Sequence, residues 1–137
     1  MSALKHRVFI FPSEAIVGEL TQFRLRLLDH APVVIRNEDE LEEALTEGLP
    51  SLFIIDLDLV ETDAAQLVER FSSDEVTSRI PVMCMSREGD MDRAEKAYIA
   101  GARDFLVIPY DPVVLERKVV RLLEGFAAKE PANTAAT

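Results

Sequence analysis

Short apolar runs and helix-spaced apolar positions alternate along this chain. The continuous apolar runs have the length of buried strands and lie at residues 8–11, 32–35, 52–55, 80–85 and 105–107. A strand that is apolar without interruption is buried on both of its faces, which is typical of a parallel sheet covered by helices on both sides. The five runs therefore predict five buried strands.

Each run is followed by a segment whose apolar residues recur at helical spacing. The periodic positions of the five segments are, in order, Ile16, Leu20, Phe23 and Leu27; Leu41, Ala44 and Leu45; Ala64, Leu67, Val68 and Phe71; Met91, Ala94 and Tyr98; and Leu115, Val119, Leu122 and Leu123. The boundary signals are the expected caps Ser13, Asn37 and Asp111, the helix-opening Pro112, and the glycines Gly48, Gly101 and Gly125 that follow the helices. Five helices are therefore expected.

Five strand–helix units predict one doubly wound α/β domain over residues 1–126, since a closed barrel would need eight such units. Residues 127–137 lose the periodicity and are expected to form a flexible C-terminal tail.

Composition and charge narrow the function. The formal net charge is −10, so a phosphate backbone would be repelled, and we expect no nucleic-acid binding. No apolar run is long enough to cross a bilayer, and residues 1–7 lack the apolar core of a signal peptide. The only cysteine, Cys84, excludes an intramolecular disulfide and a zinc site with several cysteines. We expect a cytoplasmic protein with no membrane contact.

In doubly wound sheets, ligands bind at the carboxyl ends of the strands. The residues expected there are Pro12, Ser13 and Glu14 after the first strand, Asp56 and Asp58 after the third, Ser86 and Arg87 after the fourth, and Ile108 and Pro109 after the fifth.

The order and spacing of four segments resemble the receiver domain of response regulators in two-component signalling. These segments are PSLFIIDL at residues 50–57, IPV at 80–82, AGARDFLV at 100–107 and PYDP at 109–112. The resemblance runs from about residue 7 to residue 126. It implies a flavodoxin-like, five-stranded parallel sheet in the order 2-1-3-4-5, and a phosphorelay signalling module rather than an enzyme.

The resemblance also assigns roles to single residues. Asp56 falls on the phosphoacceptor aspartate, Ser86 on the hydroxyl residue that contacts the phosphoryl group, and Phe105 on the aromatic switch of the fifth strand. Asp58 falls where the family uses a backbone carbonyl as a metal ligand, so its carboxylate is additional.

Several positions depart from the family pattern. Pro12 and Ser13 replace the acidic pair that holds Mg²⁺, leaving only Glu14 acidic, and Ile108 replaces the lysine. Further departures are Val60 and Ala64 in place of the loop proline and glycine, and Arg87 in place of a small residue. Without metal and lysine, little offsets the charge of a transferring phosphoryl group. We therefore expect a pseudo-receiver that needs no cofactor and acts by phosphorylation-independent protein–protein interaction.

Alternatives stay open. In one, Glu14 and Asp58 hold Mg²⁺ and a histidine kinase phosphorylates Asp56. Arg87 is either a solvated loop residue or a replacement cation paired with Asp56 or Asp58. A flavodoxin-like cofactor binder is disfavoured, because the turn after the first strand has no glycine.

The resemblance places the partner surface on the fourth helix, fifth strand and fifth helix. The interface candidates are Arg93, Tyr98, Phe105, Tyr110, Arg117 and Arg121, which combine aromatic anchors with charge. The expected partner is a signalling protein or a second copy of the chain.

Overall fold

The computed structural model describes residues 5–87, 89 and 91–128. Within that range the elements are β1 (Arg7–Phe11), α1 (Ala15–Leu27), β2 (Ala31–Val34), α2 (Glu38–Glu47), β3 (Leu52–Asp56), α3 (Ala64–Ser73), β4 (Val82–Ser86), α4 (Met91–Ala100), β5 (Asp104–Val107) and α5 (Pro112–Ala128). The predicted alternation of strand and helix is confirmed.

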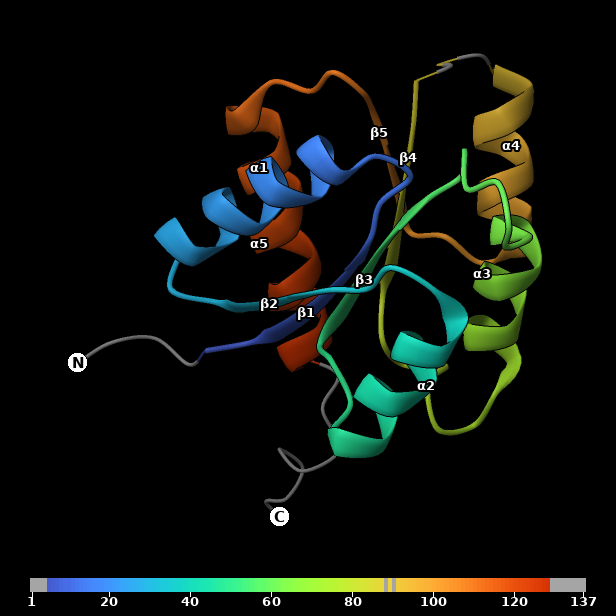
Figure 1. Cartoon of the computed structure of the whole chain (residues 1–137), viewed down its shortest axis with the longest axis horizontal. Helices are drawn as coiled ribbons and strands as arrows, with labels where there is room; N and C mark the ends of the chain where they lie inside the picture. Colours follow the sequence, from blue (N-terminus) through green and yellow to red (C-terminus); the bar gives the residue numbers. More distant parts are fainter. Residues whose placement is uncertain (1–4, 88, 90, 129–137) are drawn as a thin grey trace.

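The five strands form one parallel sheet in the order β2-β1-β3-β4-β5, as predicted. Helices α1 and α5 cover one face of the sheet, and α2, α3 and α4 cover the other (Figure 1). Every residue of β3 and β4 is buried, which explains why these runs contain no solvent-facing polar residue before their carboxyl ends. The α/β architecture is therefore the predicted one.

The sheet separates two apolar cores. On the α1/α5 face, Leu25 of α1 and Leu115 and Val119 of α5 pack against the strands. On the opposite face, Leu41 of α2 and Phe71 of α3 do the same, and the Phe71 ring stacks on Phe53 with ring centroids 4.0 Å apart. Burial of these side chains supplies most of the driving force for this fold.

Helix α1 departs from the expected pattern of burial. Its periodic apolar positions are all exposed: Ile16 58%, Leu20 53%, Phe23 57% and Leu27 61%. The face that packs on the domain consists instead of Val17, Gly18, Thr21 and Leu25. The helical period was predicted correctly, but it marks the outer face of the helix rather than the inner one.

Most helix boundaries follow the predicted signals, with two exceptions. Asn37 and Asp111 cap their helices, accepting hydrogen bonds from the Glu40 and Val113 backbone N–H groups at 2.8 and 2.9 Å. Ser13 does not cap α1, because Glu14 occupies the N-cap position and makes no side-chain cap. Helix α5 continues through Gly125 to Ala128, two residues beyond the predicted domain end.

The remainder of the predicted tail, residues 129–137, lies outside the described residues. None of the helices in the described ranges is long and apolar enough to cross a membrane.

Candidate functional site

Asp56 ends β3 at the carboxyl edge of the sheet and is fully buried. Its Oδ2 accepts hydrogen bonds from the Ser13 backbone N–H at 3.0 Å and the Ser13 hydroxyl at 2.7 Å. Its Oδ1 accepts a third from the Asp58 backbone N–H at 2.8 Å. Three neutral donors of the chain itself therefore satisfy the carboxylate.

The carboxylate of Asp58 lies at the centre of a second network. It accepts hydrogen bonds from the Ser86 hydroxyl at 3.2 Å and the Arg87 backbone N–H at 2.9 Å. Nη2 of Arg93 lies 2.6 Å from Asp58 Oδ1 and also donates to the Leu57 carbonyl at 2.9 Å. Because Arg93 belongs to α4, this ion pair ties α4 to the loop that follows β3.

Of the two alternatives for Arg87, the structure disagrees with a replacement cation paired with Asp56 or Asp58. The Arg87 side chain is partly exposed and its guanidinium pairs with Glu14, while only its backbone N–H reaches Asp58. The cation that pairs with Asp58 is Arg93, a residue expected at the partner surface. Helix α4 follows β4 and brings Arg93 within reach of the carboxyl edge of the sheet. The sequence signal for this contact is the position of Arg93 in the first turn of the helix that is predicted after the fourth strand.

This donor set does not suit Mg²⁺, which prefers several oxygen ligands in octahedral geometry. Glu14 and Asp58, the two carboxylates that could join Asp56, are each occupied by an arginine. Across the described residues, no group of three acidic, histidine or cysteine side chains is arranged to hold a metal ion. The positive charge at this site comes from the guanidinium groups of Arg87 and Arg93, which pair with Glu14 and Asp58.

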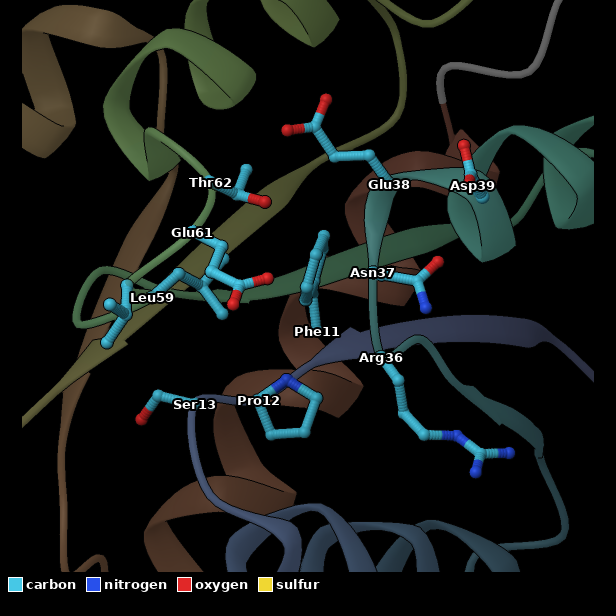
Figure 2. Close-up of a pocket in the computed structure, with 11 residues that line it drawn as sticks. Phe11, Pro12, Ser13, Arg36, Asn37, Glu38, Asp39, Leu59, Glu61 and Thr62 are labelled. Atoms are coloured by element: carbon cyan, nitrogen blue, oxygen red, sulfur yellow. The ribbon is translucent and has the colours of Figure 1, made fainter.

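Pro12 is held in place by a glycine of α1. A Cβ atom on Gly18 would lie 2.8 Å from Pro12 Cγ, so only glycine allows this close approach. Pro12 and Ser13 border a hollow of about 380 Å³ whose other walls are the start of α2 and the loop after β3 (Figure 2). Its charged residues are Arg36, Glu38, Asp39 and Glu61. With three acidic groups and one arginine, its walls repel anions such as phosphate.

Ile108 is 5% exposed and packs in the α1/α5 core with Leu106 and Leu115. It also lines a hollow of about 410 Å³ between α1 and the loop before α5. Phe105 is half-buried and packs against the opposite core. Ile108, which the resemblance places at a lysine position, is therefore a buried apolar residue that borders this hollow.

The predicted interface residues lie in different places. Tyr98 is 47% exposed on α4, and Arg117 and Arg121 are both exposed on α5. Nη2 of Arg121 also donates a hydrogen bond to Asp104 Oδ2 at 3.2 Å. Tyr110 faces α1 instead, where its hydroxyl lies 2.7 Å from Thr21 Oγ1 and burial raises its pKa. Of these residues, Arg93 pairs with Asp58 at the carboxyl edge and Tyr110 contacts Thr21 of α1.

Comparison with known families decides the classification. Residues 12–120 match the response regulator receiver domain. The chain belongs to this family. The matched range includes Asp56, Ser86 and Phe105, and the match confirms the resemblance to the family drawn from the sequence.

Relatives and solved structures agree with this assignment. The chain is 23% identical over 116 residues to the phosphate regulon transcriptional regulatory protein PhoB of Pseudomonas aeruginosa, and 24% identical over 130 residues to PhoB of Escherichia coli. These matches cover 85% and 93% of the chain but 51% and 57% of the relatives. The chain thus spans about half the length of these curated relatives.

A solved structure, the signal receiver domain of a signal transduction histidine kinase from Syntrophus aciditrophicus, is similar with a TM-score of 0.80 and 26% identity. The match covers 91% of this chain and 95% of that one. Receiver domains are signalling modules of two-component systems, so a role in signal transduction follows from membership.

Proposed function

We propose that this receiver domain is a pseudo-receiver, which signals by binding another protein without phosphorylation of Asp56. The observation that supports the proposal is the network of polar contacts at the carboxyl edge of the sheet, in which Ser13 donates two hydrogen bonds to Asp56 and Arg93 forms an ion pair with Asp58. The groups that would receive a metal and a phosphoryl group are already engaged by the chain.

Phosphoryl transfer depends on positioned cations that stabilise the oxygens of the transferring group. Here the lysine position is the buried Ile108, and the arginine nearest to Asp58 is held in an ion pair. Freeing Asp58 or Glu14 to bind Mg²⁺ would first require breaking that pair or the Arg87–Glu14 pair. The Asp58–Arg93 pair is the less exposed of the two, so breaking it leaves a charge that solvent compensates less well than in the Arg87–Glu14 pair.

The Asp58–Arg93 ion pair also supplies a substitute for the phosphorylation signal. It joins the pocket to α4, with side-chain exposures of only 24% and 32%, so solvent screens it less than a surface pair. In this proposal α4 keeps one position with no phosphoryl group bound, and the domain presents a constant surface to its partner.

That surface is the face formed by α4, β5 and α5. The exposed apolar side chains of its α4 and β5 parts include Met91 at 82%, Tyr98 at 47%, Ile99 at 80% and Val107 at 45%. Apolar and aromatic residues exposed together mark interaction surfaces. We propose that a signalling protein or a second copy of the chain binds here, with Arg117 and Arg121 at the polar rim.

Labelling with a small phosphodonor tests the proposal. The chain is incubated with acetyl phosphate and millimolar Mg²⁺, and a phosphoryl adduct is sought by intact-mass spectrometry. The matched control is a variant with Ser13→Asp, Arg93→Ala and Ile108→Lys. It introduces the acidic residue and the lysine of the family pattern at positions 13 and 108, and it removes the arginine that pairs with Asp58. The proposal expects no adduct on the natural chain. An adduct that disappears in Asp56→Asn would instead support the alternative, a phosphorylated receiver that uses Mg²⁺.

A further inference from the structure

The outer face of α1 is an apolar stripe that no part of the described chain covers. Its members are Ile16, Leu20, Phe23 and Leu27, each more than half exposed. Large apolar side chains grouped on one helix face are unusual on a monomer surface and mark a contact site. Below, "the α1 stripe" means these four residues.

The spacing of the α1 stripe is that of a helix–helix seam. Successive members are four, three and four residues apart, which is the a/d pattern of a coiled coil. At about 100° per residue, the four side chains fall within an arc of about 60°. This narrow arc is suited to pairing with one other helix, and the inner face of α1 already packs on its own domain.

The apolar surface continues beyond the helix. The hollow next to the α1 stripe is lined by Ile16, Leu20 and Phe23 of the stripe and, on its far side, by Ile108, Pro109, Tyr110 and Pro112. In Figure 1, α1 and α5 lie on the same side of the sheet. Because α1 has only 13 residues, this added surface matters for a stable contact.

Charged residues beside the α1 stripe indicate which partner would bind to it. Glu19 and Arg26 are both exposed and lie seven residues apart on the same flank of the helix. In an antiparallel pair of identical helices, the same flank of both helices faces across the contact, and the two flanks run in opposite directions. Two copies of α1 then place Glu19 of each copy opposite Arg26 of the other, giving two ion pairs related by symmetry.

We propose that two copies of this chain associate through the α1 stripe, with their α1 helices antiparallel about a twofold axis between Leu20 and Phe23. A parallel pair would instead bring Glu19 opposite Arg24 of the second copy. Arg24 is already held in its own chain by Glu116, at 2.9 Å from Nε and 2.5 Å from Nη2. The antiparallel arrangement leaves that intrachain pair intact and keeps α4, β5 and α5 accessible to a different partner.

Sedimentation equilibrium of the full chain tests whether the α1 stripe is the contact. The natural chain is expected to be a dimer that dissociates on dilution, and Phe23→Ser should raise the dissociation constant by roughly tenfold or more. The matched control is Val76→Ser, which removes an exposed apolar side chain that belongs to neither proposed surface and should leave the dimer unchanged. Ile99→Ser tests instead whether the face formed by α4, β5 and α5 is the contact. All three variants change exposed side chains, and thermal melts establish that they fold.

Charge reversal tests the orientation. Glu19→Arg and Arg26→Glu, each alone, place like charges opposite one another and should weaken the dimer by roughly five- to tenfold. The double variant restores opposite charges only in the antiparallel arrangement, so its affinity should return close to that of the natural chain. A chain that stays monomeric at high concentration overturns the proposal, as does a dimer lost in Ile99→Ser but retained in Phe23→Ser. A double variant no tighter than the single variants overturns the antiparallel pairing.

Discussion

Ser13 donates two of the three hydrogen bonds that Asp56 is seen to accept. An acidic residue at this position would repel Asp56 unless a cation lay between them, whereas Ser13 donates two hydrogen bonds to it. The buried carboxylate is therefore stabilised without metal. At Asp58, likewise, the positive charge comes from Arg93 of the chain and not from a metal ion.

Asp56→Asn tests this account of the carboxylate. An amide nitrogen cannot accept the hydrogen bonds that now converge on both oxygens, so we expect a loss of about 1–3 kcal/mol in the free energy of unfolding. Urea denaturation measures the effect, with the exposed Asp39→Asn as the control that should change little. An unchanged or higher stability for Asp56→Asn would mean that these hydrogen bonds contribute nothing.

Asp104 makes stability depend on pH. Burial of its carboxyl group acts to raise its pKa, but hydrogen bonds from Lys118, the Phe105 backbone and Arg121 outweigh burial and hold the pKa below its usual value. A depressed folded-state pKa contributes stability above the unfolded pKa of about 3.9, and that stability is lost as the pH falls through the folded pKa.

Asp104→Asn should therefore lower the free energy of unfolding by about 1–2 kcal/mol at neutral pH. Below about pH 4 the difference from the natural chain should shrink, because the natural carboxyl group becomes protonated. Urea titrations across this pH range provide the measurement. A difference that stays constant down to the lowest pH would exclude the proposed ion pairs as its origin.

At the scale of elements, α4 is connected to the pocket by Arg93. Arg93→Met keeps much of the side-chain volume but removes the ion pair with Asp58, so α4 should open more often. We expect faster amide hydrogen exchange in α4 and unchanged exchange in α2. Lys96→Met, an exposed change on the same helix, is the matched control. Equal protection of α4 in both variants would show that the ion pair does not hold the helix.

In helix α1, the apolar periodicity predicted the helix itself but not which of its faces is buried. The spacing of Ile16, Leu20, Phe23 and Leu27 correctly predicted a helix. It could not reveal which face is buried, because the inner face uses Gly18 and Thr21, which hydropathy does not recognise as core. Thr21 is fully buried there, with its hydroxyl bonded to Tyr110. The contact is between residues far apart in the sequence and has no local signal.

At the scale of the whole molecule, the sheet order and family followed from the sequence because each strand, cap and motif agreed. The pocket positions Asp56, Asp58, Ser86 and Ser13 were also predicted, and the structure places them together. What the sequence could not decide was the pairing of charges, since Arg87 and Arg93 are both within reach of the carboxylates. Only the packed positions of α1 and α4 determine which arginine pairs with which acid.

The molecule combines a hydrogen-bonded site at the carboxyl edge of the sheet with two exposed apolar surfaces, the α1 stripe and the face formed by α4, β5 and α5. A receiver that switches must respond to a metal ion and a phosphoryl group at this site. We propose that the site does not respond, because donors and arginines of the chain already satisfy Asp56, Asp58 and Glu14.

Titration with Mg²⁺ and beryllofluoride, a phosphoryl analogue, followed by amide NMR shifts, tests this claim most directly. The account predicts that millimolar Mg²⁺, alone or with beryllofluoride, leaves the amides of Ser13, Asp56 and Ser86 unmoved. The variant with Ser13→Asp, Arg93→Ala and Ile108→Lys serves as the responsive control. A saturable shift of these amides in the natural chain at sub-millimolar Mg²⁺ would contradict the account.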